Sequence, residues 1–208
     1  ALNESDLAIV VEGYLDHLRV FGAGFRNVVA VAGTAFTAQQ ASLLKRFVRK
    51  AVFIFDGDAA GETASWRALG PALSAGLDVR LALLPSGHDP DSLIRDKGPE
   101  AFREILGQSM DPVTFAAERI VKKHGREEAL NRLVEVVREI PDPIRRRLLV
   151  QNAADVLRFD EATLVRAVEA KKGDGVTVAG VATRPLSETD PVERSLIAIL
   201  LTEPGVGG

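Results

Sequence analysis

Four short apolar runs stand out in the first half of the chain, and each ends at a turn rich in glycine, proline or acid. They are Leu7–Val11, Val28–Ala32, Val52–Phe55 and Val79–Leu84. Short continuous apolar runs of this kind are typical of strands buried on both faces, as in parallel sheets.

The segments between these runs have the length and composition of helices. Tyr14–Phe21, Thr37–Val48 and Ala59–Ala75 are each long enough to cross from one parallel strand to the next, and Thr37 is a suitable N-cap for the second. The alternation predicts an α/β domain with a mostly parallel sheet.

After Pro99 the strand pattern disappears and helical periodicity takes over. Apolar residues share one helical face at 101–106, followed by Gly107 as a stop, and they recur at helical spacing through 130–140. Further helices are expected at Ile144–Leu157 and, capped by Asp160, at Glu161–Ala170.

The pattern divides the chain into four segments. Residues 1–108 form the α/β part and residues 109–172 an all-helical part. Residues 173–190 are rich in Gly, Thr, Ser, Pro and Asp and read as a linker. Residues 191–208 contain an amphipathic stretch, Val192–Leu201, which we expect to be the first helix of a further domain.

Composition narrows the possible chemistry. With 46% hydrophobic and 26% charged residues the chain has enough apolar material for a core. It has no cysteine and only three scattered histidines, which excludes disulfides, thiolate chemistry and a recognisable zinc cluster. The net charge of −3 neither indicates nor excludes a nucleic-acid partner.

The sequence shows neither a membrane-spanning run nor a secretory signal. No apolar run approaches the ~20 residues that span a bilayer, and the first residues do not resemble a secretory signal, so we expect a soluble intracellular protein. Position 1 is Ala rather than Met, so we also expect a segment of a longer protein.

Acidic residues follow three of the four predicted strands. Glu12 follows the first, Asp56 and Asp58 the third, and Asp89 and Asp91 come shortly after the fourth. Because ligands of open parallel sheets bind beyond the carboxyl ends of the strands, these acids should meet on one rim. Carboxylate clusters suit Mg²⁺ or Mn²⁺, and two ions held ~4 Å apart can clamp the attacking and leaving oxygens of a phosphoryl transfer.

Each acid also has an ordinary structural explanation. Asp58 could cap the helix that starts at Ala59, and Asp89 could cap a helix that starts at Pro90. Asp16, one turn after Glu12, could be a solvated helix residue, and the basic residues at 45–50 are more typical of a solvated face than of a phosphate site. The common sheet edge of the acids is what favours a site.

Four motifs in this order and spacing resemble the DnaG bacterial primases, and more broadly the TOPRIM fold of topoisomerases and some nucleases. The motifs are Val10–Asp16, Ala32–Thr34, Phe55–Gly61 and His88–Leu93. The resemblance implies a TOPRIM parallel sheet flanked by helices, followed by the helical subdomain of the primase catalytic core.

The resemblance also assigns roles to residues. It implies that Glu12, Asp56 and Asp58 are the catalytic, principal metal ligands and that Asp16, Asp89 and Asp91 complete the acidic site. Gly33 and Thr34 would lie near nucleic acid or nucleotide, although a simple strand–helix turn explains them equally well.

The implied activity is DNA-directed synthesis of short RNA primers by two-metal nucleotidyl transfer, with Mg²⁺ or Mn²⁺ and without zinc in this segment. The implied partners are the single-stranded DNA template, ribonucleoside triphosphates, the RNA primer and, through the domain that begins near residue 191, the replicative helicase. The implied location is the bacterial cytoplasm, at the nucleoid. The family's zinc domain and basic subdomain have no counterpart here, so we expect metal binding with little or no priming activity.

Three other functions stay open. A haloacid dehalogenase-type phosphatase also has an Asp-x-Asp after an apolar strand, but it leaves Glu12 unexplained. Another TOPRIM enzyme, a topoisomerase or a nuclease, is the nearer rival. A topoisomerase needs a nucleophilic tyrosine elsewhere, and the one tyrosine here, Tyr14, lies inside the Glu12 motif. A non-enzymatic module that docks a helicase is the third, and the full set of carboxylates argues against it.

Overall fold

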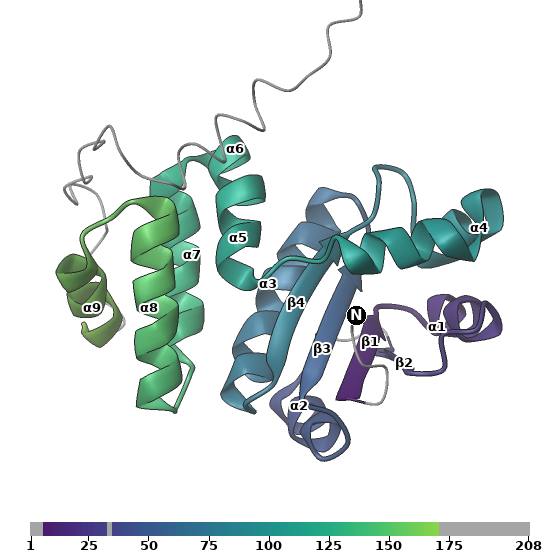
Figure 1. The fold of residues 1–208 in the computed structure, drawn as a ribbon, viewed down its shortest axis with the longest axis horizontal. Coiled ribbons are helices and arrows are strands. Elements are labelled where there is room, and N and C mark those ends of the chain that lie inside the picture. The colour runs from purple at the N-terminus through teal and green to yellow at the C-terminus, as the bar shows by residue number, and fades with distance from the viewer. Residues whose placement is uncertain (1–5, 33–34, 171–208) are drawn as a thin grey trace, which may run out of the picture.

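The computed structural model of the protein describes residues 6–32 and 35–170. Four parallel strands form one sheet in the order β2-β1-β3-β4 (Figure 1). The strands are β1 (Leu7–Val11), β2 (Val28–Ala30), β3 (Lys50–Phe55) and β4 (Asp78–Leu83). The predicted parallel α/β sheet is therefore confirmed.

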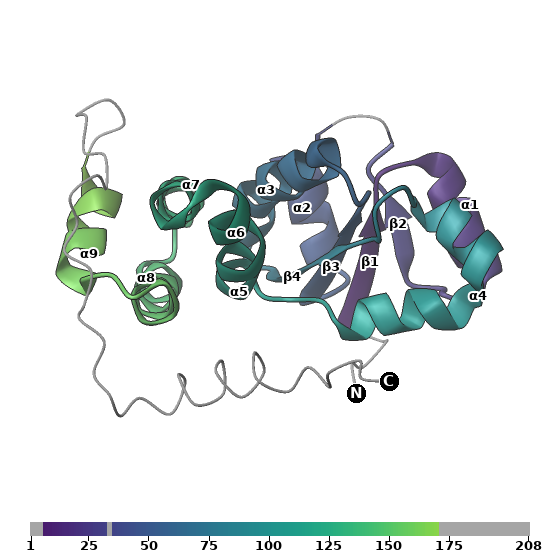
Figure 2. The ribbon, with the colours of Figure 1, turned by 90° about the horizontal axis from the view of Figure 1, so that it is seen from above.

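Helices cover both faces of this sheet (Figure 2). They are α1 (Tyr14–Gly22), α2 (Ala38–Lys45), α3 (Ala59–Ser74) and α4 (Pro90–Gly107). Alternate strand residues face opposite layers: Ile9 and Ile54 belong to the core beneath α1 and α4, whereas Val10 and Phe53 belong to the core beneath α2 and α3. This alternation explains why the strands are apolar throughout.

Strand β2 is shorter than predicted, and helix α4 extends beyond the face predicted at 101–106. Strand β2 ends at Ala30 instead of Ala32. The N–H groups of Val31 and Ala32 still donate to the carbonyls of Val11 and Glu12, but Ala32 has a φ of 61°, outside the extended region of a regular strand. Helix α4 begins at Pro90, where the ordinary explanation of Asp89 placed a helix start, and it includes the face predicted at 101–106 after an interruption at Gly98, whose φ is 83°.

The second half of the described chain is helical, as predicted. It comprises α5 (Pro112–Phe115), a π-helical turn (Ala116–Ile120), α6 (Val121–His124), α7 (Arg126–Arg138), α8 (Pro143–Leu157) and α9 (Glu161–Glu169). The apolar stripe at 130–140 is buried, and Trp66 of α3 packs edge-on against Phe115 of α5 with 6.1 Å between ring centroids. The helical part thus shares one continuous core with α3.

The predicted linker at 173–190 and the segment 191–208 lie outside the described residues, as do Gly33 and Thr34. Among the helices that the structure does describe, none is long and apolar enough to cross a membrane.

Candidate metal and catalytic site

The carboxyl ends of the strands carry a set of acids that we call the acidic rim. Glu12 follows β1 directly, Asp56 follows β3, and Asp58 is the N-cap of α3. Asp89, the N-cap of α4, comes shortly after β4. Since all four strands are parallel, these positions share one edge of the sheet, as predicted. The remaining members of the rim are Asp16 and Asp91.

Burial and mutual repulsion raise the pKa values of two acids of the rim. The pKa of Asp56 is raised to about 6, first by burial and then by the negative charges of Glu12, Asp16, Asp89 and Asp58. The pKa of Glu12 is also raised, first by burial and then by Asp16 and Asp58. The rim is a single electrostatic cluster.

Asp16 belongs to the same cluster, although it also has a local role. Its carboxylate accepts a hydrogen bond of 3.0 Å from the backbone N–H of Gly13, in the first turn of α1. Burial raises its pKa despite this bond, and the charges of Asp89 and Asp91 raise it further. The solvated-helix interpretation of Asp16 therefore does not describe its surroundings.

Most carboxylates of the rim have no ion pair within the described residues. Ion pairs there reach none of Glu12, Asp16, Asp56 and Asp58, and Oε1 of Glu12 is buried without a hydrogen-bond partner. Uncompensated carboxylates are costly to bury, and an all-oxygen donor set is what Mg²⁺ and Mn²⁺ prefer. The rim therefore fits divalent cations.

The rim is not a preformed cage. No group of three or more acidic or histidine side chains in residues 6–32 and 35–170 converges closely enough to hold a metal ion. Binding would thus require the carboxylates to draw together, against the repulsion that raises their pKa values.

Two members of the rim, Asp58 and Asp89, cap helices, which is the structural role that the sequence offered as an alternative to metal binding. Asp58 accepts the N–H of Gly61 at 2.8 Å, and Asp89 accepts the N–H of Ser92 at 2.6 Å. The hydrogen bonds from Ser92 lower the pKa of Asp89. In each case one carboxylate oxygen makes the capping bond, and capping is compatible with a second role for the other.

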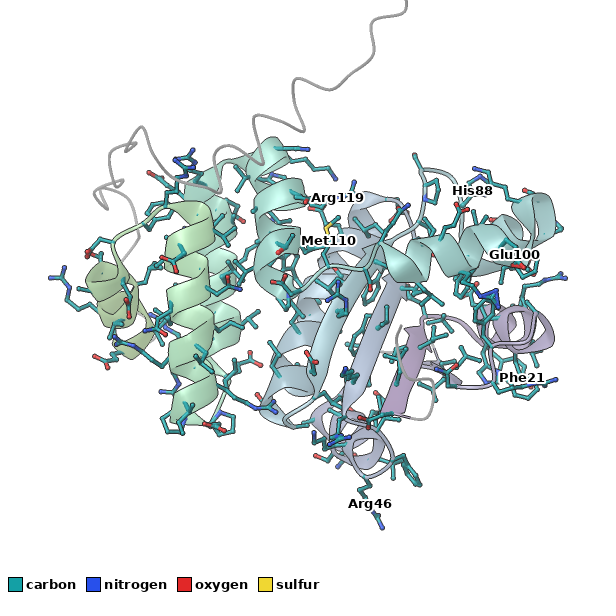
Figure 3. All side chains as sticks on the ribbon, in the orientation of Figure 1. Phe21, Arg46, His88, Glu100, Met110 and Arg119 are labelled. Atoms are coloured by element: carbon teal, nitrogen blue, oxygen red, sulfur yellow. The ribbon has the colours of Figure 1, made fainter. Side chains whose placement is uncertain are left out.

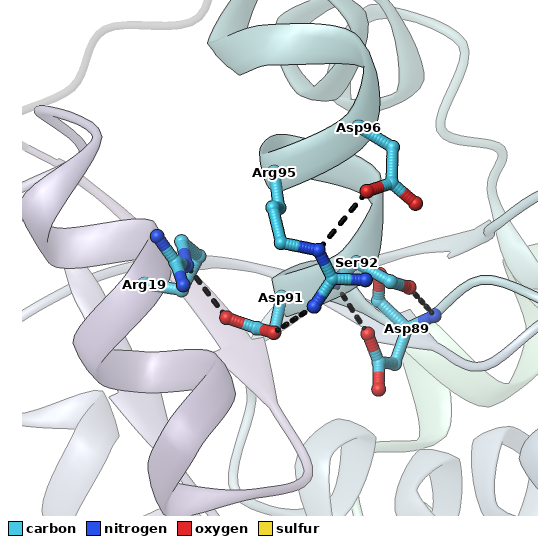
Figure 4. Close-up of polar contacts among 6 residues, drawn as sticks. All are labelled: Arg19, Asp89, Asp91, Ser92, Arg95 and Asp96. Carbon is cyan, nitrogen blue, oxygen red and sulfur yellow. Dashed lines mark hydrogen bonds and ion pairs between the residues drawn. The ribbon is translucent and has the colours of Figure 1, made fainter.

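Asp91 is engaged differently from the other acids (Figure 4). One oxygen lies 2.5 Å from Nε of Arg19 in α1, and the other lies 3.1 Å from Nη1 of Arg95 in α4. Asp91 thus bridges the two helices that carry Asp16 and Asp89. Its metal role stays a prediction, and both of its oxygens already contact arginine.

The basic residues at 45–50 lie away from the rim. Figure 3 shows Arg46 pointing outward at the opposite end of the sheet from His88, the residue before Asp89. Lys45 donates to the carbonyl of Gly76, and Arg49 pairs with Asp6. The structure supports the interpretation of this group as a solvated face.

A cavity of about 300 Å³ opens beside Glu12, between the sheet and α3. Its apolar wall includes Phe36 and Phe55, and the exposed Arg67 of α3 also lines it. Arg67 belongs to the stretch Trp66–Leu69 that adds to the primase resemblance, but the sequence assigned it no role at the site.

Comparison with known proteins places this geometry in a family. A family model described as Toprim-like matches residues 9–94, which hold all six acids of the rim. A second, described as the DnaB-helicase binding domain of primase, matches residues 122–162. A DNA primase of Legionella pneumophila is 33% identical over 97% of this chain. The chain belongs to the DnaG-type primases.

Solved structures agree with the assignment to the DnaG-type primases. The zinc-binding and RNA polymerase domains of the Aquifex aeolicus primase match 78% of the chain and 40% of that structure, with 36% identity and a TM-score of 0.70. A DnaG catalytic core matches 77% of the chain and 55% of that structure, with 32% identity and a TM-score of 0.63. The chain spans 22–35% of the length of the first three curated primases it matches.

Proposed function

We propose that this chain supplies the metal-binding carboxylates for RNA primer synthesis on single-stranded DNA. The observation that carries the proposal is the uncompensated acidic rim, in which Asp56 has a pKa of about 6 and Glu12 has an orphaned buried oxygen. Its membership of the DnaG-type primases supplies the reaction, nucleotidyl transfer from ribonucleoside triphosphates. That role predicts a cytoplasmic location, beside the nucleoid.

Five of the six acids of the rim have a defined task in this proposal. Glu12, Asp56 and Asp58 hold Mg²⁺ or Mn²⁺, and Asp16 and Asp89 add negative charge that favours the cations. Bound divalent cations supply charge neutralisation for the triphosphate and activate the primer's 3′-hydroxyl. Asp58 and Asp89 fix the rim to the first turns of α3 and α4 through their capping bonds. Gly33 and Thr34 lie outside the described residues, and their proximity to the nucleotide stays a prediction.

We expect the chain to bind Mn²⁺ while making little primer, because it spans only 35% of the Legionella primase. Electron paramagnetic resonance of free Mn²⁺ measures the binding, and extension on single-stranded DNA with ribonucleoside triphosphates measures synthesis. Glu12→Gln should weaken Mn²⁺ binding roughly tenfold or more, since a hard cation depends on ligand charge.

Two outcomes would contradict this proposal, and a third would contradict the expected low activity. Absence of Mn²⁺ binding by the unmodified chain would remove the metal site. Mn²⁺-dependent cleavage of labelled DNA would favour a TOPRIM nuclease instead. Robust primer synthesis by the chain alone would show that the template-holding parts of its relatives are dispensable.

We further propose that the helical part contacts a replicative helicase, within the residues 122–162 matched by the helicase-binding family model. Helix α8 has an exposed apolar stripe in this range, where Ile144 is 72%, Leu148 60% and Val156 41% exposed. Their spacing of four and eight residues places them on one side of the helix, as in helix-in-groove recognition. This location differs from the segment 191–208, which lies outside the described residues.

The double substitution Ile144→Asp with Leu148→Asp is expected to weaken binding to a purified replicative helicase by at least about tenfold. The melting temperature should change little, because both side chains are exposed. Leu43→Asp on α2, where the side chain is 54% exposed, is the matched control and should bind normally. Equal affinities for all three proteins by calorimetry would exclude the stripe as the contact.

A further inference from the structure

Glu62 is a buried carboxylate outside the acidic rim, and the proposed chemistry gives it no role. It lies in the first turn of α3 and is 4% exposed. A lone ionised carboxylate is rarely buried so completely, even at a helix N-terminus where the dipole favours it. Its surroundings therefore need an explanation.

Three basic residues from the helical part surround Glu62. Nζ of Lys123 lies 2.5 Å from Oε2 of Glu62, while Nε2 of His124 and Nη1 of Arg132 lie 3.8 Å and 3.9 Å from Oε1. Arg132 is itself held by Glu128 at 2.8 Å. The contact joins the N-terminal turn of α3 to α6 and α7.

The same turn also supports the acidic rim. The N–H of Glu62 donates to the carbonyl of Asp58, and the N–H of Gly61 donates to the Asp58 side chain. Gly61 also lies so close to Asp56 that a Cβ there would be 2.3 Å from the Asp56 carbonyl oxygen. Any displacement of this turn therefore moves the backbone beside Asp56 and Asp58.

We propose that Glu62 is a positioning residue through which the segment 121–132 sets the spacing of Asp56 and Asp58 for metal binding. The inference rests on the proposed metal site and adds that the helical part contributes to it. Lys123, His124 and Arg132 all fall in the range matched by the helicase-binding family model. A partner that engages those residues would thus act on metal affinity through Glu62.

Substitution of Lys123 distinguishes a positioning role from a purely electrostatic effect, because the two predict opposite changes in Mn²⁺ affinity. Removing a positive charge near the rim strengthens Mn²⁺ binding if only charge matters. If the contact positions the turn, Lys123→Met instead weakens Mn²⁺ binding, by roughly tenfold as for other groups that orient metal ligands. Lys123→Arg keeps the charge and the reach, and should retain near-normal affinity.

Lys122→Met is the matched control, because it removes the same charge from an exposed neighbour that makes no ion pair among the described residues. It should leave Mn²⁺ affinity unchanged or slightly stronger. Trp66, one turn after Glu62 and the one tryptophan of the chain, reports on α3. Its emission should shift to longer wavelength in Lys123→Met and stay constant in Lys122→Met.

The measurements are Mn²⁺ titration of the 208-residue chain, Trp66 emission and thermal melting by circular dichroism. Failure of the unmodified chain to bind Mn²⁺ would defeat the proposed function itself. Normal binding by the unmodified chain, with Lys123→Met as tight or tighter, would overturn only the positioning role. A lower melting temperature in Lys123→Met with unchanged Mn²⁺ affinity would likewise reduce Glu62 to a structural ion pair.

Discussion

Asp56→Asn is expected to abolish metal-dependent chemistry while leaving the metal-free fold at least as stable as before. Asparagine keeps the shape of the side chain but removes the negative charge, which Mg²⁺ and Mn²⁺ need as much as they need ligand geometry. In the absence of metal the lost charge relieves repulsion from Glu12, Asp16, Asp89 and Asp58. The gain is about 1 kcal/mol after allowance for solvent screening, or about 2–4 °C in melting temperature.

The pH dependence gives this prediction a second test. The folded pKa of Asp56, about 6, lies above its ordinary value of 3.8, so the folded state binds the proton more tightly than the unfolded state does. The resulting stability is fully present below pH 3.8 and is lost as the pH rises through about 6. Metal-free unmodified protein should therefore melt at a lower temperature at pH 7 than at pH 5, and Asp56→Asn should show a smaller difference.

Asp78→Asn is the control for this experiment, because Asp78 starts β4 at the opposite end of the sheet and is exposed. It should change neither Mn²⁺ affinity nor the pH dependence. Melting with and without Mg²⁺ at pH 5 and pH 7 measures all three proteins. Full Mn²⁺ affinity in Asp56→Asn would remove Asp56 from the site and leave it as part of an ordinary turn.

The sheet and most of the acidic rim were predictable because they depend on local patterns. Continuous apolar runs identify strands with both faces buried, and parallel strands must end on a common edge. Glu12, Asp56 and Asp89 could therefore be placed together without knowing any side-chain contact. The cap at Thr37 followed from the same local chemistry, and its side chain accepts the N–H of Gln40.

Long-range polar contacts were not predictable in this way. Arg19 and Asp91 are 72 residues apart, and Glu62 and Lys123 are 61 residues apart. Neither pair can be predicted from a helical or strand repeat in the sequence, since each depends on how two helices pack against each other. As a result the sequence could not show that Asp91 bridges α1 and α4, or that Glu62 joins α3 to the helical part.

The end of β2 also differs from the sequence prediction, for a reason that lies in the backbone conformation. The run Val28–Ala32 is apolar to its last residue, but the regular strand ends at Ala30, although Val31 and Ala32 still donate hydrogen bonds to the carbonyls of Val11 and Glu12. The left-handed conformation of Ala32 costs roughly 1 kcal/mol or more for a residue with a Cβ. Hydrophobicity alone carries no sign of such a turn.

Gly61→Ala is expected to destabilise the fold and weaken metal binding together, through one steric contact. A Cβ at Gly61 would lie 2.3 Å from the carbonyl oxygen and 2.9 Å from the amide nitrogen of Asp56, and neither backbone atom can rotate away. The first turn of α3 must therefore shift from β3. Overpacking of this kind typically costs about 1–3 kcal/mol, and the displaced turn carries Asp58, so Mn²⁺ affinity should fall with stability.

Gly22→Ala is the control: the same glycine-to-alanine change is expected to leave the fold as stable as before or to stabilise it. Gly22 is the last residue of α1, and a Cβ there would meet no atom within 4 Å. Alanine restricts the unfolded chain and favours the helix by up to about 0.5–1 kcal/mol. Urea unfolding followed by Trp66 fluorescence measures the free energy of unfolding. This free energy should be lower for Gly61→Ala than for the unmodified protein, and equal or higher for Gly22→Ala. Equal stabilities and equal Mn²⁺ affinities in the two variants would mean that the turn before α3 tolerates a side chain, and that its close contact with Asp56 does not set the metal site.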